Sequence, residues 1–173
     1  MIRSILFVFA LSFSQLLLAQ GVNWMTWQEA VEANQKNPKL IFVDVYTDWC
    51  GWCKKMDAST FKNPVIADYM NKHYYAVKFD AERKDTVYFA DRGFVNPKPE
   101  VKRSVHQLAR ALLDNQMGYP KFVVFNEKFE RMSIIPGYHD AKGFEPIVKF
   151  FGDRKNFEMS FPDFQAQFEG EIN

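Results

Sequence analysis

Cysteine is scarce in this sequence. Two of its 173 residues are cysteine, and both lie in a single Cys-x-x-Cys, Cys50 and Cys53. They can pair only with each other or with another molecule, which excludes a scaffold held by several disulfides. A structural disulfide usually restricts the unfolded chain by closing a long loop, and a loop of two intervening residues gains little in this way. The spacing is therefore better explained by chemistry than by stabilisation.

The chain also lacks an excess of charge of either sign, with 22 Lys plus Arg against 21 Asp plus Glu. Because affinity for nucleic acid comes largely from cationic groups that neutralise phosphates, this balance argues against a nucleic-acid partner. It supports no electrostatic role at a membrane surface either. The sequence has no internal repeat, and its 47% hydrophobic and 25% charged residues are typical of one folded domain.

Residues 1–20 carry one charge, Arg3, ahead of an apolar stretch over 5–18. That stretch is shorter than the roughly 20 apolar residues that span a bilayer, so a retained anchor is the lesser alternative. A secretory signal peptide, cleaved near Ala19, explains it better. We therefore expect a periplasmic or secreted protein that has no stable membrane insertion after cleavage.

Hydrophobic periodicity predicts alternating helices and strands in the rest of the chain. A capping box of Thr26 and Glu29 begins a helix that runs to about Asn37, and the apolar run 40–43 predicts a buried strand leading into the cysteines. The same patterns predict helices over 53–61, from 64 to about 70, over 104–114 and through 144–151, strands over 74–79, 121–125 and 132–135, and a short helix in the tail, residues 156–173.

Residues 81–101 follow no regular pattern, because Gly93, Pro97 and Pro99 interrupt it. We interpret them as the irregular first part of an insertion that extends over about residues 81–118. Its length is uncommon for a structureless loop.

A second capping box, Ser104 and Gln107, predicts where the helix of the insertion begins. Three basic residues fall on the side of this helix opposite its leucines: Arg103, His106 and Arg110. A solvated cationic face is the simpler interpretation of these residues, and a stripe that binds a partner is the alternative.

Four elements, in the right order, resemble the thioredoxin superfamily, and more closely its exported bacterial branch that includes the C-terminal domain of the thiol:disulfide interchange protein. They are the strand 42–46, the cysteine segment 49–56, the strand 77–80 and the Gly-Tyr-Pro of 118–120. The resemblance implies an α/β thioredoxin fold in a domain of residues 21–155. This fold has a central mixed β-sheet flanked by helices, here with a helical insertion before the cis-proline loop.

The resemblance places Cys50 at the exposed N-terminus of a helix, where free amides and partial positive charge stabilise a thiolate. Cys50 is therefore the expected nucleophile. Cys53, one helical turn later and less exposed, is the expected resolving thiol. The neighbouring Trp49, Gly51 and Trp52 are expected to bind substrate.

Asp44 precedes Cys50 by six residues, the spacing at which thioredoxins carry a buried carboxylate. Burial raises the pKa of a carboxyl group, which makes Asp44 a candidate proton acceptor for Cys53. The alternative is an exposed aspartate at a strand end. Lys78 matches a family lysine that approaches this carboxylate, and a solvated strand lysine is its alternative.

Tyr119-Pro120 is either an ordinary trans turn or the cis-proline loop of the family. The resemblance favours the cis form. Such a loop leaves the backbone of Tyr119 available beside Cys50, where an extended substrate segment can form hydrogen bonds with it.

Together these residues predict an exported thiol-disulfide oxidoreductase that reduces or exchanges disulfides of envelope proteins. It needs no cofactor beyond its redox-active cysteine pair, and its partners are protein thiols or disulfides and a membrane electron donor. An oxidase or isomerase of the same fold and a redox-inactive binding module are the alternatives. A copper or zinc chaperone is more distant, because no further ligands stand at metal-site spacing near the cysteines.

Overall fold

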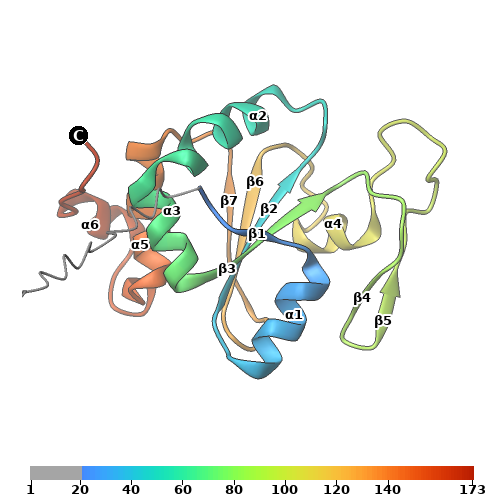
Figure 1. The fold of residues 1–173 in the computed structure, drawn as a ribbon, viewed down its shortest axis with the longest axis horizontal. Coiled ribbons are helices and arrows are strands. Elements are labelled where there is room, and N and C mark those ends of the chain that lie inside the picture. Colours follow the sequence, from blue (N-terminus) through green and yellow to red (C-terminus); the bar gives the residue numbers. More distant parts are fainter. Residues whose placement is uncertain (1–20) are drawn as a thin grey trace, which may run out of the picture.

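A five-stranded mixed sheet forms the centre of the computed structural model, which describes residues 21–173; the predicted signal peptide lies outside these residues. The strand order is β1-β3-β2-β6-β7 (Figure 1). β3 pairs in parallel with both β1 and β2. β6 is antiparallel to β2, and β7 is antiparallel to β6. The strands are β1 Trp24–Met25, β2 Leu40–Tyr46, β3 Tyr74–Asp80, β6 Lys121–Phe125 and β7 Arg131–Pro136. The predicted central mixed sheet is confirmed.

Helices flank this sheet, and most begin at a side chain that caps them. The predicted capping box of Thr26 and Glu29 is present at α1, Asn63 caps α3 ahead of Pro64, and Asp140 caps α5. The helices are α1 Trp27–Lys36, α2 Gly51–Ala58, α3 Pro64–His73, α4 Gln107–Leu112, α5 Ala141–Gly152 and α6 Phe161–Ala166, with 3-10 turns η1 Thr60–Lys62 and η2 Lys155–Phe157. Among residues 21–173, no helix combines the length and the apolar character needed to cross a bilayer.

Strand β2 is buried on both faces because its alternate side chains enter two separate cores. Leu40 and Phe42 pack with residues of α2, α3 and α5, whereas Ile41, Val43 and Val45 pack with residues of α1 and α4. Successive side chains of a strand point to opposite faces, which explains the continuous apolar run. The strand that leads to the cysteines is therefore anchored from both sides.

Four phenylalanines form the core beneath α2. The ring centroids of Phe42 and Phe122 are 5.4 Å apart, and those of Phe61 and Phe144 are 5.5 Å apart. Phe122 and Phe144 are also 5.5 Å apart. Aromatic pairs at such spacings each add about 0.5–1.5 kcal/mol beyond the burial of their surface. Met56 of α2 belongs to the same core, so this helix packs on the sheet through it.

The insertion contains a β-hairpin, so the prediction of an irregular segment over 81–101 is wrong in part. β4, Val87–Phe89, pairs with β5, Arg92–Phe94, and Ala90 and Asp91 make the turn with φ of 48° and 58°. Such turns favour Asn and Gly, and Ala-Asp therefore offers no hairpin signal in the sequence. Tertiary packing stabilises the hairpin, because the Phe89 ring lies 5.1 Å from that of Trp27.

The helix of the insertion, α4, has a different cap from the one predicted. Nδ1 of His106 accepts a hydrogen bond from the backbone N–H of Leu108 at 3.1 Å, whereas the Ser104 hydroxyl donates to Asn96 at 2.6 Å. The predicted capping box of Ser104 and Gln107 is therefore wrong. So is the interpretation of His106 as part of a solvated face: its side chain is fully buried, with Nε2 3.1 Å from the carbonyl oxygen of Asp85, and burial lowers its pKa.

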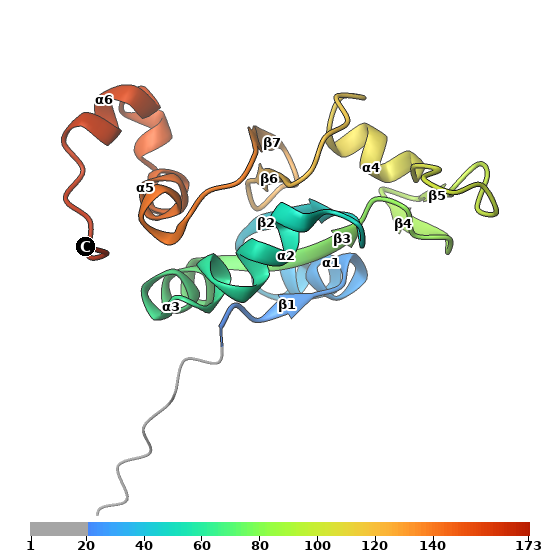
Figure 2. The same ribbon diagram turned by 90° about the horizontal axis from the view of Figure 1, so that it is seen from above.

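The insertion and the C-terminal tail lie at opposite ends of the molecule (Figure 2). In the tail, α6 packs on α5, with the rings of Phe161 and Phe164 each 5.3 Å from that of Phe150. The buried carboxylate of Glu145 accepts hydrogen bonds from the backbone N–H groups of Glu171 and Ile172. The chain therefore ends against the core and away from the cysteines.

Candidate active site

The two cysteines stand where β2 ends and α2 begins. Cys50 is the N-cap residue of α2, Cys53 lies in its first turn, and the two form a disulfide. Their side chains are 4% and 2% exposed. The predicted position at the helix N-terminus is present, and Cys53 is the less exposed residue, as predicted. Cys50, which was expected to be exposed, is buried as well in this disulfide form. The two cysteines also differ in position, one capping the helix and the other inside it.

The surroundings of the Cys50 sulfur favour negative charge. The backbone N–H of Cys53 points at Cys50 Sγ, with 3.1 Å between nitrogen and sulfur. The partial positive charge of the α2 N-terminus acts at the same place. Both effects stabilise a thiolate at Cys50 once the disulfide is reduced, which suits Cys50 for nucleophilic attack.

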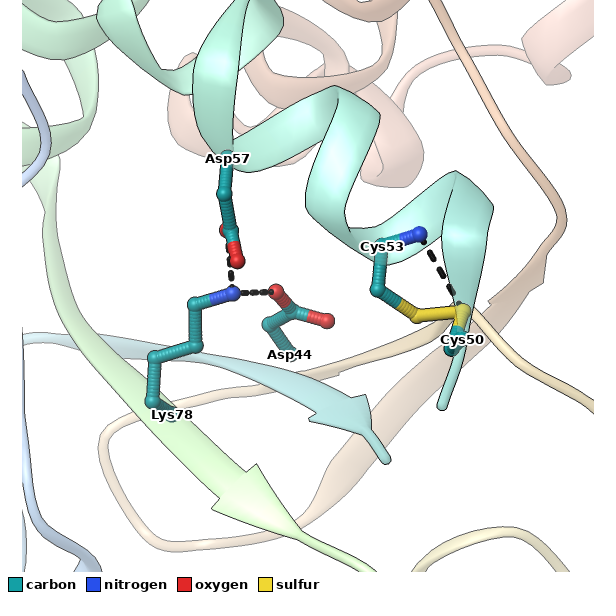
Figure 3. Close-up of a disulfide and its surroundings, with 5 residues drawn as sticks. All are labelled: Asp44, Cys50, Cys53, Asp57 and Lys78. Atoms are coloured by element: carbon teal, nitrogen blue, oxygen red, sulfur yellow. Dashed lines mark hydrogen bonds and ion pairs between the residues drawn. A yellow bond between two sulfur atoms is a disulfide. The ribbon is translucent and has the colours of Figure 1, made fainter. Parts of the chain in front are cut away.

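Asp44 lies behind the disulfide and is 1% exposed, so the alternative of an exposed strand end is wrong. Its Oδ2 is 2.7 Å from Nζ of Lys78, while its Oδ1 is buried without a hydrogen-bond partner among the described residues. The unpaired oxygen points to the side on which the disulfide lies (Figure 3). Burial raises the pKa of this carboxyl from its usual value near 3.8 to about 6, although Lys78 opposes the shift.

Lys78 bridges two carboxylates, those of Asp44 and Asp57, so the alternative of a merely solvated lysine is wrong (Figure 3). Burial lowers the pKa of Lys78, but the two carboxylates outweigh that effect and raise it overall. Asp57 was not among the site residues predicted from the sequence. It follows Cys53 by four residues, and this spacing on one face of a helix is the signal that identifies it.

The surface beside the cysteines carries exposed aromatic side chains. Trp49 is 50% and Trp52 56% exposed, whereas Gly51 between the cysteines has open space around it. The Trp52 ring lies 4.8 Å from that of Tyr138, and Nζ of Lys55 lies about 5 Å from both rings. We call Trp49, Trp52 and Tyr138 the aromatic rim. Tyr138 and Lys55 were not among the predicted site residues, because no motif marks them.

The Tyr119-Pro120 peptide bond is cis, as predicted. The Pro120 carbonyl oxygen accepts a hydrogen bond from Gly137 at 2.9 Å. Within residues 21–173, the backbone N–H and C=O of Tyr119 have no partner. The Tyr119 ring meets that of Trp49 edge to face at 5.9 Å. This loop therefore combines free backbone groups with the aromatic rim, as an extended peptide requires.

No group of three or more histidine, cysteine, aspartate or glutamate side chains within residues 21–173 is arranged to hold a metal ion.

The mixed sheet, the cysteine pair at the start of α2 and the cis-proline loop define a thioredoxin-fold protein with a dithiol–disulfide site. The predicted membership of the thioredoxin superfamily is confirmed.

The chain belongs to the Thioredox_DsbH family, described as a protein of unknown function, DUF255, whose family model matches residues 12–134. A solved structure described as DsbH Oxidoreductase superposes with a TM-score of 0.56 and 18% identity, over 87% of this chain and 94% of that one. A thioredoxin from Thermus thermophilus superposes with a TM-score of 0.57 and 16% identity, over 76% and 87%. At these identities the likeness establishes the fold.

Curated relatives share parts of the sequence. Disulfide bond reductase DsbH of Chlamydia pneumoniae is 25% identical over 127 residues, which are 70% of this chain and 68% of that protein. Spermatogenesis-associated protein 20 of Homo sapiens is 34% identical over 67 residues, 38% of this chain. An uncharacterized protein of Caenorhabditis elegans is 34% identical over 73 residues, 40% of this chain. The chain covers only 8% of the human and 10% of the nematode protein.

Proposed function

We propose that the protein is a thiol-disulfide oxidoreductase that reduces disulfides of exported proteins and is itself reduced by a membrane dithiol donor. The observation that carries this proposal is the unpaired, buried oxygen of Asp44 behind a disulfide at a helix N-terminus. A structural disulfide has no need of a costly buried acceptor beside it. The direction of reduction draws on the relative named disulfide bond reductase, and export draws on the apolar stretch over residues 5–18.

The reaction begins with the reduced protein. The Cys50 thiolate attacks one sulfur of the substrate disulfide, that bond breaks, and a mixed disulfide forms. The other substrate sulfur leaves as a thiolate and takes a proton from solvent. The amide of Cys53, 3.1 Å from Cys50 Sγ in the oxidised form, stabilises the attacking thiolate.

Resolution of the mixed disulfide needs a thiolate at Cys53. The Cys53 thiol gives its proton to Asp44 and attacks Cys50 Sγ, the mixed disulfide breaks, and the second substrate thiolate leaves. Because the pKa of Asp44 is about 6, its carboxylate is mostly ionised at neutral pH and accepts this proton. Two electrons have then moved to the substrate, and a donor dithiol returns two electrons to the Cys50–Cys53 disulfide by the reverse exchange.

The order of these steps is tested by two cysteine variants. Cys53→Ser leaves the nucleophile but removes the resolving thiol, and so substrates should remain attached to Cys50. Cys50→Ser removes the nucleophile and should trap few proteins. Both variants would be exported in a Gram-negative host and compared on non-reducing gels. Bands sensitive to dithiothreitol with Cys53→Ser alone are expected, and mass spectrometry would identify the trapped proteins.

Equal adducts from both variants would show that the two roles are wrongly assigned. Adducts from neither, together with an insulin reduction rate equal to that of Cys50→Ser, would replace the proposal with a redox-inactive binding module. In either case circular dichroism of the purified variants controls for folding.

The direction of electron flow is tested by equilibrating the cysteine pair with glutathione of known ratio. A reduction potential below about −200 mV, towards the value of thioredoxin, is expected for a reductase. A value near −120 mV, as in a strong oxidase, would overturn the reductase. The measurement is decisive because about 30 mV corresponds to about 1.4 kcal/mol for a two-electron couple.

A further inference from the structure

Trp49 is one of the points at which the insertion meets the cysteine site. The indole Nε1–H of Trp49 donates to Oε1 of Glu82 at 2.7 Å. The guanidinium carbon of Arg103 lies over the indole, 4.9 Å from the ring centroid. Glu82 and Arg103 both belong to the insertion, and they hold the indole with opposite charges. Trp49 nevertheless remains half exposed, so one part of its surface is fixed while another is free to meet a partner.

The backbone at Arg103 is held in a conformation that its residue type disfavours. Its φ is 64°, in the left-handed region that side chains other than glycine rarely adopt. The next residue, Ser104, is held by the buried Asn96, whose Nδ2 donates to the Ser104 carbonyl at 2.8 Å and whose Oδ1 accepts from the Ser104 hydroxyl at 2.6 Å. Such conformations persist only where the surroundings determine them strongly. The position of Arg103 over the indole is therefore a built feature of the loop.

We propose that Arg103 is a positioning residue that fixes Trp49 as a rigid wall beside Cys50 for polypeptide disulfides; this inference rests on the proposed function. An indole stacked beneath a guanidinium and hydrogen-bonded to a carboxylate loses little further freedom when a chain packs on it. Arg103 contacts neither cysteine and neither Asp44 nor Lys78 within the described residues. It acts on recognition of a polypeptide and not on the exchange of sulfur bonds.

Removal of the guanidinium should therefore separate two classes of substrate. Arg103→Ala should raise KM for a polypeptide disulfide, such as insulin, by about two- to fivefold, the range that an exposed cation over an aromatic ring provides. Its kcat should stay at the wild-type value. The rate with a small aromatic disulfide and the reduction potential should not change, because neither depends on a chain lying against Trp49.

Lys102→Ala is the matched control, because it removes one positive charge from the adjacent exposed position and Lys102 makes no hydrogen bond, ion pair or ring contact within the described residues. It should behave as the wild type. Arg103→Lys keeps a cation over the indole and should recover part of the lost affinity. Acrylamide quenching of tryptophan fluorescence, corrected with a Trp49→Phe variant, should increase in Arg103→Ala alone.

Two results would overturn the inference while leaving the proposed function intact. One is an Arg103→Ala variant with wild-type KM for insulin, and the other is an equal loss of rate with the small disulfide, which would indicate a redox or folding role. A wild-type protein that reduces neither substrate would remove the proposed function and this inference together.

Discussion

The two sides of the Cys50–Cys53 disulfide differ in almost every physical property. Behind it lie the charged groups of Asp44, Lys78 and Asp57, with Asp44 1% exposed. In front lies the aromatic rim, whose tryptophans are at least half exposed. Of the charged groups, Asp44 is buried, whereas the side chains of Lys78 and Asp57 are 19% and 42% exposed. A buried carboxylate beside exposed tryptophans is the reverse of the usual distribution of residue types.

This difference indicates that the two sides of the disulfide have different roles. Burial makes the charged form of a carboxylate costly, and the pKa of Asp44 rises to about 6, close to the pH at which proton transfer is useful. Exposed indoles offer apolar surface that a partner can cover at low cost in conformational entropy. Under the proposed function, the rear side would control proton transfer, and the front side would control which molecules reach Cys50.

The largest expected effect comes from the rear side. Asp44→Asn removes the proton acceptor, so release of the mixed disulfide should slow by about 100-fold at pH 7. In the wild type the release rate should rise as the pH increases through about 6, where Asp44 ionises, and the variant should lack this step. Quenched-flow measurements on a preformed mixed disulfide would record both rates.

Asp48→Asn is the matched control for that experiment, because Asp48 is an exposed carboxylate two residues before Cys50. It should leave the rate and its pH dependence unchanged. Equal pH profiles for the wild type and Asp44→Asn would place proton transfer elsewhere and break the proposed division between the two sides.

The same carboxylate should govern a smaller effect, on stability. Because the pKa of Asp44 is about 6 in the folded state and near 3.8 otherwise, the folded protein binds the proton more tightly. Its free energy of unfolding therefore falls as the pH rises from about 4 to about 6, and this contribution is constant above that window. Asp44→Asn lacks the fall, so its advantage in stability over the oxidised wild type should widen across this window.

Denaturant titrations of both oxidised proteins at several pH values would measure this difference. Other titrating groups cancel in the comparison, since the two proteins differ at one position. A difference that stays constant between pH 4 and pH 7 would contradict the raised pKa of Asp44.

The smallest expected effect belongs to the front side. Trp52→Ala removes an exposed ring that meets Tyr138 and Lys55, and KM for insulin should rise by about two- to fivefold. The reduction potential should stay at the wild-type value. Tyr88→Ala, which removes an exposed ring on the β4–β5 hairpin, serves as the control and should not alter KM. A changed potential in Trp52→Ala would show that the rim also tunes the cysteines.

The features that were predictable from the sequence are those carried by local spacing. The Cys-x-x-Cys, the aspartate six residues before it and the Tyr119-Pro120 pair are positions in a pattern, and the strands beside them follow from periodic apolar residues. The capping box at Thr26 was equally local and is present. Each of these depends on residues that are near one another in the chain.

Tertiary structure alone decided the contacts that give the site its shape. Trp49 and Glu82 are 33 positions apart, and Arg103 reaches the same indole from 54 positions away, distances at which no sequence pattern links two side chains. The buried cap at His106 likewise depends on the carbonyl oxygen of Asp85, which the folded hairpin brings beside it. Local spacing identifies the reactive residues, because thiol-disulfide exchange needs particular residue types at fixed intervals in the chain. Tertiary structure determines which side chains surround those residues, because segments far apart in the sequence meet only when whole helices and strands pack together.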